Sequence, residues 1–564
     1  MQDAVEARGL SAGEQSKVVE RGLEEIALLL GFSDKGRFKA QAYERGAEVV
    51  GALSFELGAV IERGRLTDIE GIGASLSKQI LELWSTGSSA LLEKLRAENP
   101  PGAAELVRIP GVTPKRVHAL HAGLGIASVA DLRAACEAGR VRGLSGFGAK
   151  TEAKLLAAID AVTQAERGEP RMTLGDALSL CARWQSELLT LPGVEAVELA
   201  GPARRGEETL DELALVVVHA GAQLVHAVEE RADVVHAELA GDVLRAARID
   251  GIPMRLYLTD SANAGTTLLR ATGPEAHLRE LEARAPLSAR ASEQDVYVEL
   301  GLPLVPPELR DAPIDATQTY DDLITAADIR GFVHCHTTHS DGKHSIEEMA
   351  RAAKERGMDY ITITDHSPSA YYARGVTLDR LQAQWDEMRE AEQRVGIRIL
   401  RGTESDILAD GALDYPDEIL AQLDVVIASI HSRFKLGKAE MTERLVRAMK
   451  LPVFKIWGHA LGRLLLSRAP IECDVEAVLD ALASSRGAIE INGDPHRLDL
   501  PPQWIRPARE RGIPFVLSVD AHSTKGLDVL PFAAQMGRRG GLRKSEVLNT
   551  LDADAFVQRV RPSP

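Results

Sequence analysis

The sequence predicts a multidomain α/β protein in which helical domains come first and a barrel of parallel strands comes last. Its 564 residues exceed what one hydrophobic core can hold, and the 45% apolar content can fill several cores. Glycine-containing turns open helix-patterned runs within the first 150 residues. After residue 330, apolar strands alternate with helix-patterned runs about seven times, which is typical of a closed or nearly closed parallel barrel.

The N-terminal part carries apolar side chains at helical spacing, for example over Val18–Leu30 and Gly73–Trp84. Glycine turns of one kind recur there and beyond. They are Gly71 with Gly73, Gly111 followed by Lys115, and Gly146 with Gly148 followed by Lys150. In a helix-hairpin-helix, such turns let backbone N–H groups at a helix start approach a phosphate.

Charge is unevenly distributed along the chain. The net charge is −17, yet residues 101–155 hold eight basic and four acidic side chains, a local surplus of +4. This surplus favours a patch that follows a DNA backbone, and the alternative is a solvated helical face. We expect a cytoplasmic protein, associated with the nucleoid when bound to DNA and not with a membrane. The sequence has no apolar leader and no run of about 18 apolar residues.

Ionisable residues follow the predicted strands of the C-terminal part. His334 and His336 lie two apart on one strand, so their side chains face the same way and Cys335 faces the other. Asp341 follows in a turn, and later strand ends supply His366, Glu404, His431, His459, Asp520 and His522. Because parallel strands bring their carboxyl ends to one mouth, the imidazoles and carboxylates at these strand ends predict a metal centre.

The predicted ligands also indicate the chemistry. Imidazole and carboxylate groups without thiolates favour Zn, Mn or Fe over Mg or Ca. Clustered divalent cations activate water and bind phosphoryl oxygens, which predicts a phosphoesterase that needs no separate catalytic base. Arg463 and Lys435 follow His459 and His431 and are expected to grip a phosphate oxygen. For Lys435, a solvated loop cation is the alternative.

These nine positions, with Ser340-Asp341-Gly342 and Asp365-His366, resemble the polymerase-and-histidinol-phosphatase (PHP) phosphoesterases. The resemblance implies a distorted (β/α)7 barrel that binds three divalent metal ions. It assigns one ion to His334, His336, Glu404 and Asp520, a second to Glu404, His431 and His459, and a third to Asp341, His366 and His522.

The order of features along the chain resembles the bacterial family X DNA polymerases that carry a C-terminal PHP domain. Phe38–Tyr43 resembles the start of their small N-terminal domain, and Leu300–Arg310 resembles the end of their thumb. The domains implied are a lyase-like helical domain at 1–90, helix-hairpin-helix fingers at 91–165, a nucleotidyltransferase-like palm at 166–260, a thumb at 261–312, a linker at 313–327 and the PHP barrel at 328–564.

The palm departs from the family pattern at its catalytic positions. An arginine pair is kept at Arg204 and Arg205, but the positions of the metal-binding carboxylates fall on Glu212, Ala214 and Arg255. Two-metal nucleotidyl transfer needs carboxylates to hold its cations. We therefore expect a degenerate palm that folds but does not polymerise.

The predicted function is metal-dependent 3′-5′ exonucleolytic trimming or end processing of DNA in repair. We expect a monomer that acts on gapped, nicked or 3′-end DNA. Three alternatives stay open: an active family X polymerase with an accessory exonuclease, a small-molecule phosphatase of the histidinol-phosphatase kind, and a non-catalytic DNA-binding scaffold.

Overall fold

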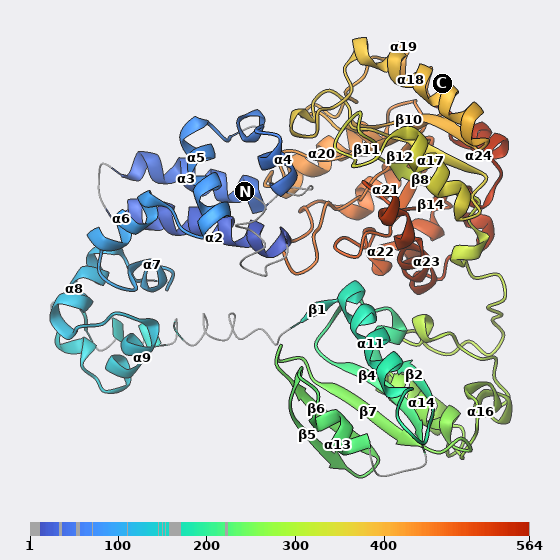
Figure 1. Cartoon of the computed structure of the whole chain (residues 1–564), viewed down its shortest axis with the longest axis horizontal. Coiled ribbons are helices and arrows are strands. Elements are labelled where there is room, and N and C mark those ends of the chain that lie inside the picture. Colours follow the sequence, from blue (N-terminus) through green and yellow to red (C-terminus); the bar gives the residue numbers. More distant parts are fainter. Residues whose placement is uncertain are drawn as a thin grey trace. The chain divides into compact units, whose positions relative to one another are not determined.

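The computed structural model describes residues 12–32, 36–51, 57–69, 71–109, 111–144, 146–148, 151–152, 154–156, 159, 171–219 and 224–562. The chain forms two compact units that divide between residues 169 and 170 (Figure 1). This division lies close to the predicted end of the fingers at residue 165, and the finer domain boundaries stay predictions. Among the described residues, no helix combines the length and apolar character needed to cross a membrane.

The first unit, in its described residues, consists of helices joined by turns. The longer helices are α2 (Ala12–Leu30), α3 (Arg37–Gly51), α5 (Ala74–Thr86), α6 (Ala90–Glu98), α8 (Pro114–Leu124) and α9 (Val129–Glu137). Helix α2 buries Val19, Leu23 and Ile26, which recur at helical spacing on one face. Gly22 lies on α2 where a side chain would collide with Leu83 of α5, so its small size permits close helix packing.

The second unit begins with a five-stranded sheet in the order β2-β4-β7-β6-β5. Its strands are β2 (Val194–Ala200), β4 (Leu213–His219), β5 (Val234–Ala240), β6 (Val243–Arg248) and β7 (Met254–Thr259). The interior strand β4, between β2 and β7, is apolar on both faces. Leu213, Leu215 and Val217 join the core that includes α11 (Leu174–Leu188), whereas Ala214 and Val216 join the cluster that includes α14 (Ala264–Thr272). This sheet falls within residues 166–260, which were predicted to form the palm, and is called the palm sheet below.

A small helical region follows the palm sheet, in the position predicted for the thumb. Its helices α15 (Glu275–Glu282) and α16 (Glu293–Glu299) bury Leu281, Val296 and Tyr297 in a core of their own. The residues after it run into the C-terminal barrel. Ile324 donates its N–H to the carbonyl of Leu542 at 3.0 Å, so the predicted linker is fastened to the barrel.

Seven parallel strands form the C-terminal barrel in chain order. They are β8 (Gly331–Cys335), β9 (Tyr360–Ile363), β10 (Arg398–Asp406), β11 (Val425–Ser429), β12 (Lys455–Trp457), β13 (Gly487–Asn492) and β14 (Phe515–Ser518). The first and last strands meet through N–H···O bonds from Val519 to Val333 (3.2 Å) and from Ala521 to His334 (3.0 Å). The barrel is thus nearly closed, and the predicted fold class is confirmed.

Helices separate these strands and cover the barrel. They include α17 (Ile346–Glu355), α18 (Leu378–Val395), α20 (Lys438–Met449), α21 (Val475–Ala483), α22 (Pro502–Glu510), α23 (Leu530–Arg539) and α24 (Ala553–Val560). Alternate strand residues such as Val333, Leu400 and Val516 form a second apolar cluster together with Phe556 of α24. Polar side chains therefore collect at the other end of the strands, where the loops to the helices begin.

Candidate metal centre

All nine side chains predicted as ligands come together at the carboxyl end of the barrel. Four overlapping groups hold potential ligand atoms within 4.8 Å of one another. They are His336 with Asp341, His366 and His522; His334 with His459 and Asp520; His334 with His336 and Glu404; and His366 with Glu404 and His431. Strands β8 and β10 and the loops after β8, β9, β11, β12 and β14 supply them, which is the arrangement that the strand-end pattern predicts.

Glu404 lies at the centre of the cluster. Its Oε1 atom is 2.8 Å from His459 Nε2 and 3.1 Å from His431 Nε2. Its Oε2 atom is 3.0 Å from His366 Nδ1 and 3.3 Å from His334 Nε2. One carboxylate thus faces imidazoles on both of its oxygens, as a ligand shared between two ions would.

The backbone of the centre holds unusual conformations. His334, His459 and Asp520 have φ values of +69°, +22° and +46°. Each such conformation costs a non-glycine residue about 1–3 kcal/mol and is found mainly where function requires it. At these positions the backbone turns the side chains toward the other donors.

Buried polar atoms test whether the residues fit metal ions. Several ligand atoms are buried and make no hydrogen bond in the described structure. They are His334 Nε2, His336 Nδ1 and Nε2, Asp341 Oδ2, His366 Nδ1, Glu404 Oε2 and His459 Nδ1. Leaving so many polar atoms unsatisfied is costly unless something else binds them. The donor set therefore fits divalent cations.

Partners outside the cluster orient its imidazoles. His334 Nδ1 lies 2.5 Å from Glu490 Oε1, and His431 Nδ1 lies 2.8 Å from Asp406 Oδ1. Such carboxylates fix the tautomer and direction of a ligating imidazole and raise its basicity. Sequence reasoning missed Glu490. The signal that could have found it is a lone acidic residue within an otherwise apolar strand, Ala488–Asn492.

The charge of the centre governs how it takes up ions. At two of the imidazoles the neighbouring carboxylates outweigh burial, which by itself lowers the pKa: Glu404 raises the pKa of His431 to about 9, and Asp341 raises that of His522 to about 9. At His336 burial prevails and lowers the pKa to about 4. At neutral pH the metal-free centre therefore holds imidazolium groups whose protons must leave before a metal ion can bind.

We expect Mn²⁺ binding to release protons and to strengthen as the pH rises from 6.5 toward 9. The reason is that His431 and His522 lose their protons over this range. Titration calorimetry in buffers of different ionisation enthalpy would count the released protons. An affinity that stays constant between pH 6.5 and 8.5, with no proton release, would contradict this assignment.

The two side chains predicted to bind a phosphate oxygen differ in burial. Lys435 lies on the exposed loop between β11 and α20. Arg463 is buried, and its guanidinium donates to the carbonyl of Arg497 at 2.9 Å and to Glu208 Oε1 of the palm at 2.6 Å. Arg497, which the sequence did not single out, contacts one of the donors: its Nε lies 3.4 Å from Asp520 Oδ2.

The degenerate palm positions lie side by side. Ala214 on β4 pairs with Arg255 on β7, and Arg255 forms an ion pair of 2.7 Å with Glu212. Arg204, of the arginine pair that matches the family pattern, forms an ion pair of 2.7 Å with Glu293. Among the described residues, no group of potential metal ligands gathers in the palm.

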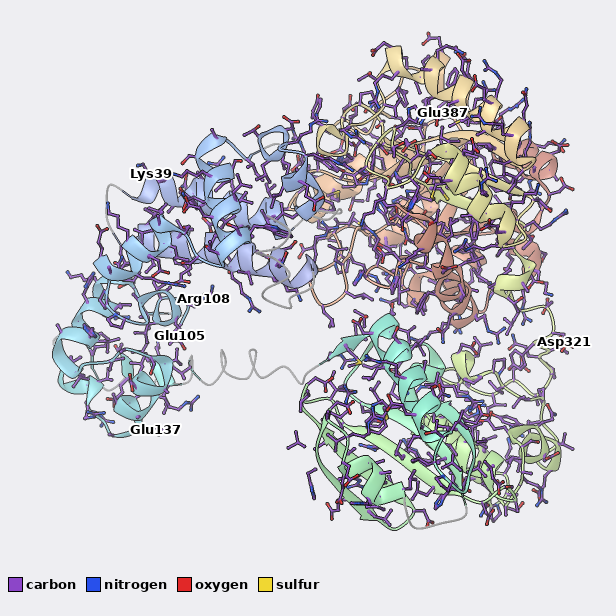
Figure 2. All side chains as sticks on the ribbon, in the orientation of Figure 1. Lys39, Glu105, Arg108, Glu137, Asp321 and Glu387 are labelled. Carbon is purple, nitrogen blue, oxygen red and sulfur yellow. The ribbon has the colours of Figure 1, made fainter. Side chains whose placement is uncertain are left out.

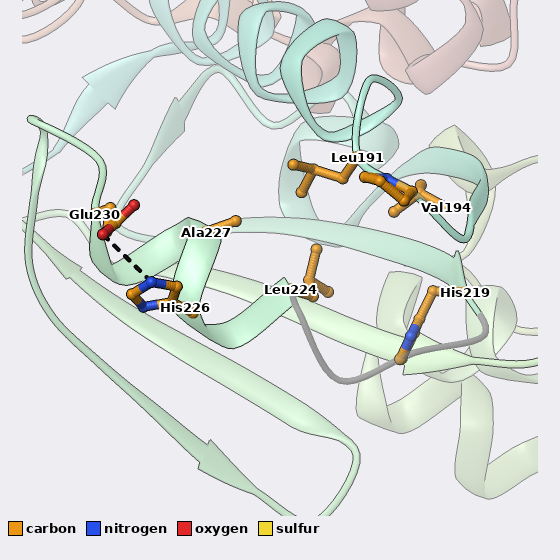
Figure 3. Close-up of a pocket in the computed structure, with 8 residues that line it drawn as sticks. Leu191, Val194, His219, Leu224, His226, Ala227 and Glu230 are labelled. Carbon is orange, nitrogen blue, oxygen red and sulfur yellow. Dashed lines mark ion pairs between the residues drawn. The ribbon is translucent and has the colours of Figure 1, made fainter.

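A shallow pocket of about 270 Å³ opens elsewhere in the palm, beside Leu191, Val194 and Leu224 (Figure 3). The ion pair drawn in Figure 3 joins His226 Nε2 to Glu230 at 3.3 Å, and both side chains are exposed. Exposed pairs of this kind contribute little. The pocket therefore does not compete with the metal centre as a candidate site.

The three glycine turns share one backbone geometry. Gly71, Gly111 and Gly146 have φ values of +93°, +90° and +84°, and each is exposed. In each turn the next residue donates its N–H to the carbonyl three positions earlier, at 3.0, 2.9 and 3.0 Å. Only glycine adopts this φ at low cost. Gly73 and Gly148 are also exposed, and no neighbour would block a Cβ there.

The basic side chains of this region are partly paired. Arg108 contacts Glu24 at 3.1 Å and Arg142 contacts Glu152 at 2.6 Å. Figure 2 shows side chains of both signs here, with Glu105, Arg108 and Glu137 labelled. Lys115 is exposed at the start of α8, whereas Lys150 lies outside the described residues.

Comparisons with known proteins agree with this layout. The family described as PHP domain matches residues 333–493, and the one described as SAM-like helix-hairpin-helix tandem matches residues 103–161. The DNA polymerase/3′-5′ exonuclease PolX of Bacillus subtilis (strain 168) is 32% identical over 574 residues, covering 96% of this chain and 99% of that protein.

Relatives of the barrel alone also occur. A probable phosphatase of Thermoanaerobacter sp. (strain X514) is 29% identical over 232 residues, covering 38% of this chain and 89% of its own. A probable phosphatase of Vibrio campbellii is 29% identical over 235 residues, covering 40% of this chain and 89% of that protein. With its helix-hairpin-helix turns, its palm and its nine-donor barrel, the chain belongs to the bacterial family X DNA polymerases with a C-terminal PHP domain.

Proposed function

We propose that this protein is a metal-dependent nuclease that trims or processes DNA ends in the 3′-5′ direction during repair. The observation that carries the proposal is the cluster of nine buried or half-buried donors, several of whose atoms have no hydrogen-bond partner in the described structure. The helix-hairpin-helix turns supply a place for a DNA backbone in the same chain. Gapped, nicked and 3′-end DNA are the proposed substrates of a monomeric enzyme.

The proposed centre binds three divalent ions, of Zn, Mn or Fe. The nine donors would hold them as the family resemblance assigns, with Glu404 shared between two ions. Bound ions supply activated water and neutralise phosphoryl oxygens. Glu490 and Asp406 orient the imidazoles of His334 and His431, and Arg497 adds a buried positive charge beside Asp520.

The palm, in this proposal, does not polymerise. The ion pair between Glu212 and Arg255 occupies the place where carboxylates would hold cations, and Ala214 offers no ligand. A positive side chain there repels the cations that nucleotidyl transfer needs. The same division of the chain into lyase-like, fingers, palm, thumb, linker and barrel regions is part of the proposal.

Digestion of labelled oligonucleotides would test the nuclease. A 5′-labelled, 3′-recessed duplex incubated with Mn²⁺ should give a ladder of products shortened from the 3′ end, while a small phosphomonoester such as histidinol phosphate should react far more slowly. Rapid phosphomonoester hydrolysis without DNA cleavage would favour the small-molecule phosphatase. DNA binding with neither reaction would favour a scaffold.

We expect Lys115→Ala to weaken DNA binding similarly for all DNA sequences. The slope of log affinity against log salt concentration should also become shallower by about 1. Lys115 is exposed in the first turn of α8, next to the open Gly111 turn. Fluorescence anisotropy at several salt concentrations would measure this. Lys94→Ala is the matched control, because Lys94 is also exposed but pairs with Glu98 on α6 (3.8 Å), away from the glycine turns. Equal losses in both variants would contradict the assignment.

A further inference from the structure

A loop beside the metal centre contacts one of the predicted metal ligands. This loop, residues 493–500, joins β13 to α22. Its Arg497 is 3% exposed, and the Nε atom lies 3.4 Å from Oδ2 of the predicted ligand Asp520. Asn492, just before the loop, donates to the same oxygen at 3.1 Å. The position of the 493–500 loop therefore influences where Asp520 points.

Arg463 holds this loop in place. Its guanidinium donates to the carbonyl of Arg497 at 2.9 Å and also to the carbonyl of Leu498. The N–H of Leu461 adds a bond of 3.0 Å to the carboxylate of Asp499. Leu498 has a φ of +45°, a conformation that persists only when surrounding contacts enforce it.

The palm holds Arg463 in turn. Glu208 Oε1 accepts from Arg463 at 2.6 Å, and both side chains are largely buried, at 22% and 10% exposure. Glu208 is itself fixed, because its carbonyl accepts from the N–H of Leu174 at 3.0 Å. The palm touches the loop a second time, where Gly175 faces Pro495 so closely that a Cβ would lie 2.6 Å from it.

We propose that the palm supplies a positioning residue to the metal centre: Glu208 orients Arg463, and through it the 493–500 loop, so that Asp520 can bind its ion. The inference rests on the proposed metal-dependent function of the barrel. Without Glu208, the buried guanidinium of Arg463 loses the carboxylate that it contacts, and removing one partner of a buried ion pair is strongly destabilising. Arg463 would then turn toward water and release the two carbonyls that it holds. A palm without polymerase chemistry would thus still serve hydrolysis.

The test measures Mn²⁺ binding to the full chain by titration calorimetry. We expect Glu208→Ala to weaken Mn²⁺ binding about tenfold, at the low end of what removing an outer partner of a metal ligand costs. Glu208→Gln, which keeps the shape and an acceptor oxygen, should lose less. The matched control is Glu308→Gln, which breaks another ion pair with the barrel, Glu308–Arg538 at 2.7 Å, that includes no residue of the 493–500 loop. It should bind Mn²⁺ like the parent.

Two results would overturn the inference: unchanged Mn²⁺ affinity in Glu208→Ala, or an equal loss in Glu308→Gln, which would show general loosening instead of positioning. Thermal unfolding of each variant identifies any that fails to fold, and the isosteric Glu208→Gln then carries the test. Binding of Mn²⁺ needs no substrate. If the parent protein cleaves no DNA while Glu208→Ala still weakens Mn²⁺ binding, the nuclease proposal fails and the positioning role stands.

Discussion

Replacement of His366 or Asp520 by alanine is expected to lower DNA hydrolysis at least about 100-fold, since removing even the outer partners of metal ligands costs 10–100-fold. His366 Nδ1 lies 3.0 Å from Glu404 Oε2. Asp520 Oδ1 lies 3.5 Å from the Nε2 atoms of both His334 and His336. Each substitution therefore removes a donor from the middle of the cluster.

DNA affinity should stay near that of the parent protein, because the helix-hairpin-helix turns belong to the other compact unit. Cleavage rates of a labelled duplex and anisotropy of the same duplex would separate the two effects. His339→Ala is the matched control: it removes an imidazole from the same turn as Asp341, but this imidazole pairs with Glu387 at 2.7 Å. Undiminished cleavage by His366→Ala or Asp520→Ala would refute the role of the nine donors.

Template-directed primer extension by this protein is expected to be absent, even with Mn²⁺. The remaining carboxylate, Glu212, is neutralised by the guanidinium of Arg255 at 2.7 Å, and Ala214 is buried beside them. Holding two cations next to a triphosphate requires carboxylates that this arrangement lacks. We expect such a loss of ligands to remove the chemistry and leave the fold, since Ala214 packs in an apolar cluster with Ala200 and Val216.

The Bacillus subtilis relative, whose name includes DNA polymerase, is the positive control for the extension assay. Gel analysis of a labelled primer on a gapped template would measure extension in both proteins, with the barrel inactivated by Asp520→Ala so that trimming does not hide products. Robust extension that Glu212→Gln abolishes would overturn the proposal of a silent palm. It would also restore the active-polymerase alternative.

Much of the fold was predictable because its signals are local. Each barrel strand is a short apolar run that ends in a polar residue, and each intervening helix repeats apolar residues at helical spacing. The glycine turns were recognisable for the same reason: a left-handed backbone conformation favours glycine wherever it occurs. The palm sheet was placed by resemblance, with no strong periodic signal of its own.

By itself, the sequence determined which nine donors could gather, because strand-end positions in parallel strands converge on one mouth. Tertiary structure alone decided what surrounds them. Arg463 follows the predicted ligand His459 closely in the sequence, yet its side chain forms an ion pair with Glu208, 255 positions away. Glu490 gained its role from the imidazole of His334, 156 positions earlier. Pairings between side chains so distant in sequence depend on how separate elements pack, and no local pattern records that.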